Sequence, residues 1–388
     1  MQRNSIHTYK KPQRWPGATY WMILFITIVL LISLTVGFFT SLALTGGVAD
    51  TNDPNGSGNN GSIVNNDAKR GNKTGIVLPS ATPSGKYLST TSENFQTVSG
   101  ITSEAAILVD ADSMTTVAGK NNDVVIHPAS MTKVMTLLVA CERLDDPNAL
   151  LTIKQEMLDR RKQLEGSGEL VDNTTVVNSF EDTEVIQIVD KAITVEDALY
   201  LINYQSDTVA CLMVAEYIAG SEAEFVKLMN DKAKEIGLEK TKFVNCTGLT
   251  ELTGEYNTTT CREMAAIMNC AIKNEVAKRI LSSTQKYKAD IYEYGQKTDC
   301  YIPFFADWYN REARLNGNTR AGKVTIQGGK TGYEDIPTSC FITYGISSSN
   351  ARTYICVIVG RMTDSKNPLV YNATGTADTR TIYKNYAG

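Results

Sequence analysis

The sequence predicts an α+β fold for residues 100–388, with an antiparallel sheet flanked by helices. Two observations predict it: strand-like segments stand near both ends of this region, and helical segments fill its middle. Strands grouped apart from helices are typical of an antiparallel sheet covered by helices. A long uncharged segment closer to the N-terminus adds a transmembrane helix to this architecture.

The N-terminal region has the pattern of a signal anchor. Residues 20–44, YWMILFITIVLLISLTVGFFTSLAL, carry no charge, and about 20 apolar residues span a bilayer. Residues 1–19 contain no acid and four basic residues: Arg3, Lys10, Lys11 and Arg14. Because positive residues stay inside, we expect a cytoplasmic tail at 1–19. A cleaved signal peptide is the alternative, but its apolar region would be only about 7 to 15 residues long.

The next segment changes sharply in composition. Residues 45–99 are rich in Gly, Asn, Ser, Thr and Asp, as in TNDPNGSGNNGS. Such a segment cannot bury enough apolar area to offset its ordering entropy. We therefore expect a flexible linker at 45–99 and a folded domain at 100–388.

The folded domain begins with a predicted hairpin and a buried helix. AAILVDAD (105–112) is a short apolar run bounded by turn residues, and 115–118 can return beside it. Residues 131–144, MTKVMTLLVACERL, predict a buried helix with Ser130 as its N-cap. Residues 155–188 are polar, acidic and weakly patterned, which predicts an insertion at the surface.

Helices and then strands follow. The apolar periodicity predicts three helices, at 194–203, 208–219 and 222–236. Two strand-like segments joined by a polar turn stand near the C-terminus, at 339–346 and 353–361. A short helix is expected over 378–386. The strands near the start of the domain can pair with those near its C-terminus, although helices lie between them in the sequence, as the α+β fold requires.

Composition excludes several classes of function. The 38 Lys and Arg against 42 Asp and Glu give a net charge of -4, with no basic excess for nucleic acid. Only His7 and His127 exist, so a multi-histidine metal site lacks ligands and a Ser-His-Asp triad could use only His127. The eight cysteines contain no C-x-x-C pair, and buried free thiols are favoured over disulfides. Catalysis would therefore depend on Ser, Lys, Cys or carboxylates.

The pair Ser130 and Lys133 opens the predicted buried helix. Residues three apart share a helix face, so the lysine can lie beside the serine hydroxyl and accept its proton. The helix N-terminus adds N–H groups near any oxyanion formed on the acyl group. Alone, this S-x-x-K pattern is weak, because such pairs are common, and an N-cap with a surface lysine would be the better explanation.

Two further motifs raise its specificity. Gly328-Gly329-Lys330-Thr331-Gly332 precedes a strand-like segment and offers a cation and a hydroxyl for a carboxylate. Between them, Ser206-Asp207-Thr208 stands at the turn between two helices. S-x-x-K, S-D-N and K-T-G occur together, in this order, in serine β-lactamases and penicillin-binding proteins.

The domain resembles the low-molecular-mass penicillin-binding proteins, serine-type D-Ala-D-Ala carboxypeptidases with the β-lactamase/DD-peptidase-like fold. The resemblance covers most of residues 103–361, through AAILVDAD, HPASMTKVMT, ITVEDALYLI, AEYIAGSEAEFVKLMN, KEIGLEKTKFVN and GGKTGYED. It implies Ser130 as the acylated nucleophile, Lys133 as its base and Ser206 as the proton shuttle. It also implies that Lys330, Thr331, Gly332 and Thr208 bind substrate, and that the backbone N–H groups of Ser130 and Tyr333 form the oxyanion hole.

The sequence departs from the family at several positions. Thr208 stands where Asn is usual, which puts substrate positioning and turnover in doubt. An alternative alignment reads Tyr204-Gln205-Ser206 as a variant of the middle motif, but it needs a two-residue gap. His127 lies three residues before the serine, and we expect it to be structural. The family's second, β-rich domain and C-terminal anchor are not predicted here, so residues 20–44 would supply the anchor.

These features together predict a membrane-anchored serine D-Ala-D-Ala carboxypeptidase facing outward from a bacterial cell membrane. It would remove the terminal D-Ala of peptidoglycan stem peptides through an acyl-enzyme, and β-lactams would be its covalent inhibitors. No metal or organic cofactor is implied, because the protein supplies every group. The alternatives are a penicillin-binding-like scaffold with impaired turnover, a D,D-endopeptidase, and a β-lactamase. The last needs an additional glutamate to activate water, and the candidates are Glu165, Glu169 and Glu181.

Overall fold

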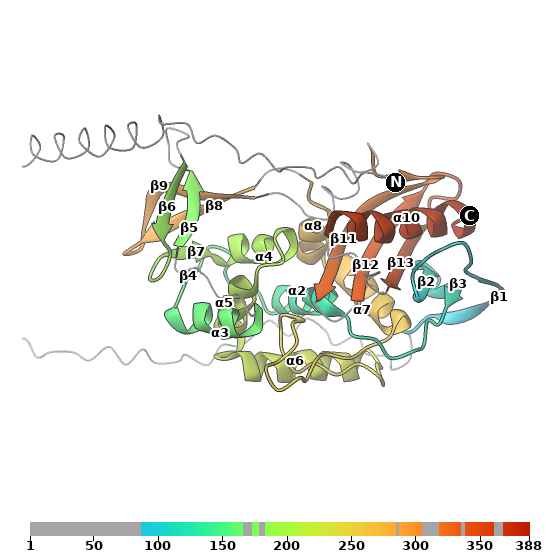
Figure 1. Cartoon of the computed structure of the whole chain (residues 1–388), viewed down its shortest axis with the longest axis horizontal. Helices are drawn as coiled ribbons and strands as arrows, with labels where there is room; N and C mark the ends of the chain where they lie inside the picture. Colours follow the sequence, from blue (N-terminus) through green and yellow to red (C-terminus); the bar gives the residue numbers. More distant parts are fainter. Residues whose placement is uncertain are drawn as a thin grey trace, which may run out of the picture. The chain divides into compact units, whose positions relative to one another are not determined.

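A seven-stranded sheet forms the centre of the domain (Figure 1). The computed structural model describes residues 87–165, 173–177, 183–284, 287–304, 318–334, 338–360 and 368–388, all within one compact unit. The strands are β1 (Thr90–Thr97), β2 (Ala105–Asp110), β3 (Thr115–Lys120), β10 (Arg320–Ala321), β11 (Val324–Glu334), β12 (Thr338–Ser347) and β13 (Thr353–Gly360). Their order is β1-β3-β2-β13-β12-β11-β10, and only β1 and β3 pair in parallel.

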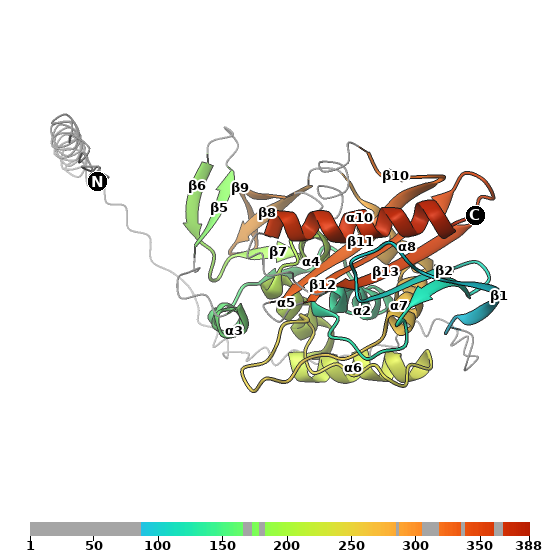
Figure 2. The same ribbon diagram turned by 45° about the vertical axis from the view of Figure 1, so that its right-hand side comes forward.

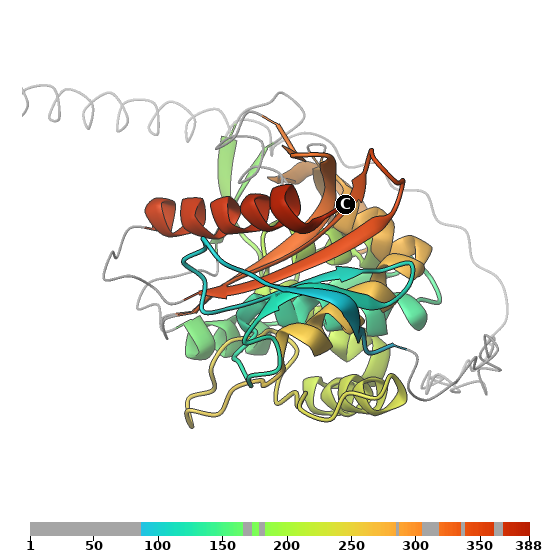
Figure 3. The same ribbon diagram turned by 90° about the vertical axis from the view of Figure 1, so that its right-hand side faces the viewer.

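Helices cover both faces of this sheet, which confirms the α+β prediction. The helix α10 (Pro368–Tyr386) runs along one face, against β12 and β13 (Figures 2 and 3). On the other face lie α2 (Lys133–Glu142) and α7 (Cys261–Lys273), with α8 (Glu275–Ser282) against β11. Because both faces are covered, β2 and most of β13 are buried along their length, and their sequences are continuous apolar runs.

The predicted helices of the middle region form where local signals place their ends. The helix α4 (Val195–Tyr204) starts at a capping box between Thr194 and Asp197. Asp207 caps α5 (Thr208–Ala219), which ends at Gly220 with φ +82°. Ser221 caps α6 (Glu222–Glu235). The hairpin of β2 and β3 and the antiparallel pair of β12 and β13 are also confirmed.

Three local expectations differ from the structure. Ser130 caps no helix: it lies inside a 3₁₀ turn, η1 (Ala129–Thr132), and the helix proper begins at Lys133. The C-terminal helix begins at Pro368, ten residues before the predicted start, because the polar, Gly-containing run 372–376, NATGT, interrupts the apolar pattern after its first turn. The ordered sheet begins with β1, inside the range assigned to a linker. Most of the side chains of β1 are exposed, so no apolar alternation marks it.

Residues 155–188 contain regular structure where a surface insertion was expected. They hold α3 (Gln155–Glu165), β5 (Asn173–Val177) and β6 (Thr183–Gln187). The two strands join a second sheet of order β4-β7-β8-β9-β5-β6, with β4 (Leu150–Thr152), β7 (Ala192–Thr194), β8 (Tyr287–Glu293) and β9 (Gln296–Phe304). This sheet was not predicted because its strands are short or polar and come from distant parts of the chain. The predicted strand pairs therefore account for only one of the two sheets.

The structure bears on the N-terminal predictions only in part and on the cysteines in full. The predicted tail, transmembrane segment 20–44 and most of the linker lie outside the described residues. Among the residues that are described, no helix has both the length and the apolar character needed to cross a bilayer. All eight cysteines are free thiols, and seven of them are buried.

The buried carboxylate of Asp378 joins α10 to the two residues Thr102 and Ser103, which lie just before β2. Its Oδ2 accepts hydrogen bonds from the backbone N–H groups of Thr102 and Ser103, at 3.1 and 2.7 Å, and from both hydroxyls. We expect Asp378→Ala to lower the free energy of unfolding by about 2 to 4 kcal/mol, because four donors lose a charged acceptor. Denaturant unfolding would measure this loss. Asp231→Ala, at an exposed ion pair with Lys234, is the matched control and should change it by less than about 1 kcal/mol. Equal losses in the two variants would contradict the prediction.

Candidate active site

Ser130 and Lys133 form a buried pair at the start of α2. Their side chains meet because η1 and the first turn of α2 place residues three apart on one face. Lys133 Nζ lies 3.0 Å from Ser130 Oγ and donates a second hydrogen bond, of 2.6 Å, to the Thr247 carbonyl. Lys133 is only 1% exposed and Ser130 only 7%. The structure therefore brings together the nucleophile and base that the resemblance implied.

The backbone just before Ser130 is held in an unusual conformation. Ala129 has φ +46°, in the left-handed region that L-residues with a side chain rarely adopt. Its carbonyl packs against Gly248, where an added Cβ would lie 2.0 Å from the oxygen. Its N–H donates to His127 Nδ1 at 2.9 Å. The position of Ser130 thus depends on the His127 side chain two residues before Ala129 and on Gly248 from a distant loop.

His127 has a structural place beside the turn. Its Nε2 lies 3.2 Å from Thr250 Oγ1, and its ring stacks on Tyr256 with 4.8 Å between centroids. Burial lowers the pKa of the imidazole to about 4. The ring is therefore neutral near pH 7, so that Nδ1 can accept the Ala129 N–H while Nε2 donates. Both ring nitrogens are engaged, which agrees with the structural role expected from the sequence.

Ser206 and Lys330 form a second serine–lysine pair. Lys330 Nζ donates to Ser206 Oγ at 3.0 Å and to the Thr331 carbonyl at 2.9 Å. Ser206 lies in the turn between α4 and α5 with φ +58°, a left-handed conformation that few non-glycine residues adopt. Lys330 is 1% exposed, on β11. The central motif and the Lys-Thr-Gly motif therefore meet, as predicted.

Glycines let β11 approach the serine turn. A Cβ on Gly332 would lie 3.0 Å from the Pro128 carbonyl and 3.3 Å from Ala129 Cβ, so this strand lies directly against η1. Tyr333, the next residue, has an exposed fraction of 37%. The turn that carries Ser130 and the strand that carries Lys330 thus lie in direct contact.

Thr208 lies below the surface of the site. Only 2% of it is exposed, and its hydroxyl donates to Glu165 Oε1 at 2.9 Å. The other carboxylate oxygen of Glu165 accepts from Arg161 Nε at 2.9 Å. Of the three glutamates considered for water activation, Glu165 is thus beside the central motif, whereas Glu169 and Glu181 lie outside the described residues.

Sequence reasoning missed the loop that holds Lys133. Asn245 Oδ1 accepts the N–H groups of Thr247 and Gly248, at 3.2 and 2.8 Å, and so sets the direction of the Thr247 carbonyl. Asn257 Nδ2 joins this loop to Thr132 Oγ1 at 3.0 Å. The family-like run ending in Gly248 was visible in the sequence, but nothing in it marks a backbone carbonyl as a contact of the base.

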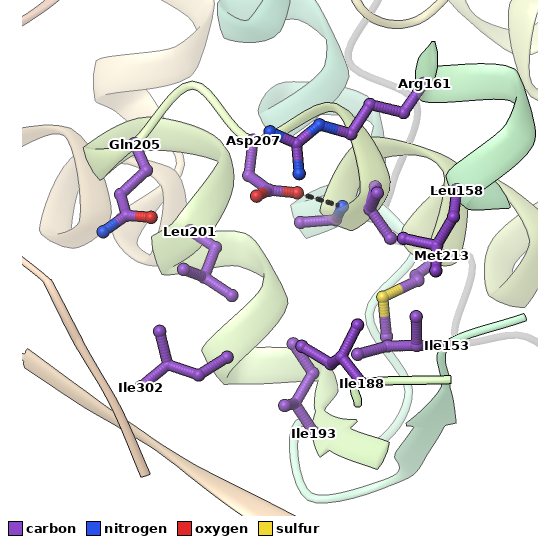
Figure 4. A pocket seen from close by; sticks show the side chains of 12 residues that line it. Ile153, Leu158, Arg161, Ile188, Ile193, Leu201, Gln205, Asp207, Met213 and Ile302 are labelled. Carbon is purple, nitrogen blue, oxygen red and sulfur yellow. Dashed lines mark hydrogen bonds between the residues drawn. The ribbon is translucent and has the colours of Figure 1, made fainter. Parts of the chain in front are cut away.

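A small apolar cavity borders the central motif (Figure 4). It measures about 70 Å³, and Gln205, Asp207 and Arg161 line its polar side, with isoleucines, leucines and Met213 around the rest. Sites for drug-sized ligands usually have about 300 to 1,000 Å³. We therefore assign this cavity to packing behind the Ser206 turn.

The buried His127 predicts a specific pH dependence of stability. The folded-state pKa of about 4 lies below the ordinary value of 6.5, so the unfolded chain binds the proton first as pH falls. The His127 contribution is complete above pH 6.5 and is lost down to about pH 4, at up to about 1.4 kcal/mol per pH unit. Denaturant unfolding between these pH values would measure it. In His127→Asn, whose Oδ1 can still accept the Ala129 N–H, this slope should disappear; equal slopes in both proteins would contradict the assignment.

Comparisons of the sequence find several curated relatives. DacF of Bacillus subtilis (strain 168), a D-alanyl-D-alanine carboxypeptidase, is 33% identical over 184 residues, which cover 47% of this chain and 42% of that protein. DacC of Escherichia coli (strain K12), with the same description, is 31% identical over 43% of this chain and 38% of its own length. The chain thus spans less than half the length of the curated relatives it matches.

Solved structures share the fold at low sequence identity. A mutant of the Streptomyces K15 DD-transpeptidase superimposes with a TM-score of 0.56 at 19% identity, over 73% of this chain and 99% of that one. A D-alanyl-D-alanine carboxypeptidase of Mycobacterium tuberculosis H37Rv gives 0.55 at 18% identity, over 74% and 94%. Residues 90–363 match the family described as D-alanyl-D-alanine carboxypeptidase. Because this match covers more than half of the chain, the protein belongs to the D-alanyl-D-alanine carboxypeptidase family.

Proposed function

We propose that this protein is a serine D-Ala-D-Ala carboxypeptidase that removes the terminal D-Ala of peptidoglycan stem peptides. The observation that carries the proposal is the pairing of Ser130 with Lys133 and of Ser206 with Lys330, each at 3.0 Å between nitrogen and oxygen. One pair supplies an activated hydroxyl, and the other supplies a second hydroxyl with a cation for a substrate carboxylate. Both lysines are buried, where electrostatic interactions are stronger than in water.

The proposed reaction uses these groups in sequence. Ser130 Oγ attacks the carbonyl carbon between the two D-Ala residues while Lys133 Nζ takes its proton. The N–H groups of Ser130 and Tyr333 stabilise the oxyanion. The C–N bond to the terminal D-Ala then breaks: Ser206 gives its hydroxyl proton to the leaving amine and is reprotonated with the proton that Lys133 took. Lys330 and Thr331 bind the carboxylate of that D-Ala. Water finally hydrolyses the acyl ester and restores Ser130.

The proposed location follows from the N-terminal sequence. Residues 20–44 would anchor the chain in a bacterial cell membrane, with residues 1–19 in the cytoplasm and the domain outside. Peptidoglycan stem peptides are then within reach of the domain, and β-lactams would acylate Ser130 as covalent inhibitors. Among the described residues, no cluster of three His, Cys, Asp or Glu side chains suits a metal ion, and the proposed steps need none.

The contact between Thr208 and Glu165 supports two alternative functions, a penicillin-binding scaffold and a β-lactamase. Because the Thr208 hydroxyl already donates to Glu165, it would contribute less to positioning a substrate. A protein with such impaired turnover would act as a penicillin-binding scaffold. The contact also places a carboxylate beside the central motif, which a β-lactamase would use to activate water. The lifetime of the penicilloyl adduct separates these outcomes, since a β-lactamase would release it within a turnover.

Labelling with a fluorescent penicillin tests the nucleophile. We expect the full-length chain in detergent to form one stable adduct, seen on a gel and by intact mass, because Lys133 activates the Ser130 hydroxyl. Ser130→Ala should abolish the adduct. Ser348→Ala, at an exposed serine that only donates to the Lys323 carbonyl, should label like wild type. A folded wild-type protein that forms no adduct would refute the proposed function.

Restoring the usual residue at position 208 tests turnover. We expect Thr208→Asn to change kcat/KM for a D-Ala-D-Ala peptide by less than about fivefold, because the Asn amide can donate to Glu165 as the Thr208 hydroxyl does. Release of D-Ala would be measured for both proteins. A gain above about tenfold would instead favour the scaffold with impaired turnover.

A further inference from the structure

The helix α3 presents two neighbouring arginines to two different loops of the site. Arg161 lies beside Asp207 (Figure 4) and pairs with Glu165, which in turn accepts from Thr208. Arg160 points to the other side. Its Nε lies 3.2 Å from Glu222 Oε2, and its Nη2 lies 2.8 Å from Glu251 Oε1. One helix, in the region expected to be a surface insertion, is thus joined to the turn that carries Ser206 and to the loop whose Thr247 carbonyl accepts from Lys133.

A series of hydrogen bonds through the 245–251 loop connects Arg160 with Lys133, the proposed base. Glu251 Oε1, which pairs with Arg160, also accepts from Asn245 Nδ2 at 2.8 Å. Asn245 Oδ1 accepts the N–H groups of Thr247 and Gly248, and the Thr247 carbonyl accepts from Lys133 Nζ at 2.6 Å. Four hydrogen-bonded steps therefore separate the guanidinium from the lysine.

Glu222, the second carboxylate partner of Arg160, binds the same loop near its other end. Glu222 Oε1 accepts from the Cys246 backbone N–H at 3.3 Å, one residue before Thr247. The side chains are partly buried, with 28% of Arg160, 19% of Glu222 and 15% of Glu251 exposed. Burial lowers the pKa of the Arg160 guanidinium, but the two carboxylates outweigh it and raise the pKa overall. A planar guanidinium with two carboxylate partners fixes their relative positions better than an exposed lysine could.

We propose that Arg160 is a positioning residue for Lys133, acting through Glu251, Asn245 and the Thr247 carbonyl. The proposal rests on the function proposed above, in which Lys133 takes the Ser130 proton. The carbonyl accepts one N–H of the lysine, which orients Nζ toward Ser130 Oγ. Loss of Arg160 frees both carboxylates, lets the loop shift and misdirects the lysine. Misplacement by about 1 Å can cost about a hundredfold in rate.

Pre-steady-state acylation tests this role. The full-length chain in detergent would be mixed with increasing fluorescent penicillin, which separates the dissociation constant of the first complex from the acylation rate constant. We expect Arg160→Ala to lower the rate constant by about 10- to 100-fold and to leave the dissociation constant within about threefold. Arg160→Lys keeps the cation and should recover part of the rate. If Arg160→Ala lowered only the fraction of protein that can be acylated and left the rate constant unchanged, the role of Arg160 would be merely structural. This result would overturn the proposal.

Two controls sharpen the test. Lys154→Ala removes a cation just before α3 whose partner, Glu216, lies on α5 and outside the 245–251 loop. It should acylate within about twofold of wild type; an equal loss would contradict the path through the loop. Combining Arg160→Ala with Glu251→Gln should slow acylation no further than Arg160→Ala alone, because both changes break one chain. Additive losses would refute this coupling.

Hydrogen exchange separates this proposal from the proposed function. In Arg160→Ala, the Thr247 and Gly248 amides should exchange about tenfold faster or more, since their acceptor Asn245 loses its support. If the wild type forms no adduct, the proposed function fails, while this exchange still decides whether Arg160 orders the loop. Unchanged exchange in the variant would overturn the positioning role even in an active protein.

Discussion

A buried lysine is the constraint on which the site depends. Lys133 is almost fully enclosed, so its Nζ must end among hydrogen-bond partners, because a buried polar group without partners is costly. Its two partners are Ser130, one helical turn away, and the Thr247 carbonyl, more than a hundred residues later. The long-range partner cannot be reached unless the 245–251 loop is already packed against α2. Assembly of the site and folding of the domain are therefore one event.

The backbone at both serines carries strain that this packing maintains. Ala129 and Ser206 adopt positive φ values, which cost about 1 to 3 kcal/mol each in residues other than glycine. In each case the surroundings fix the conformation. His127 and Gly248 contact Ala129, and the capped start of α5 follows Ser206. Such strain directs a side chain where regular structure would not, which suits groups that must meet a substrate.

Local signals predicted much of this structure, and long-range contacts account for what they missed. The bounds of α5 follow from an apolar run with Asp207 before it and Gly220 after it, both visible in sequence. The three motifs likewise identified the four side chains that pair in the site. The second sheet and the role of α3 depend on partners far along the chain. No periodicity reveals that Arg160 meets Glu251, because neither residue type nor spacing encodes that contact.

The seven buried thiols have a chemical consequence for this domain. Burial raises the pKa of the Cys211, Cys261 and Cys270 thiols to about 12, so thiolate is scarce at neutral pH. Thiolate is the form that attacks disulfides and reacts with oxidants. The native interior is thus nearly inert to peroxide and to mixed-disulfide exchange, and α5 and α7 become vulnerable only when they open. The extent of cysteine oxidation would therefore increase with the frequency of unfolding. Molecules that stay folded would not be oxidised at these thiols.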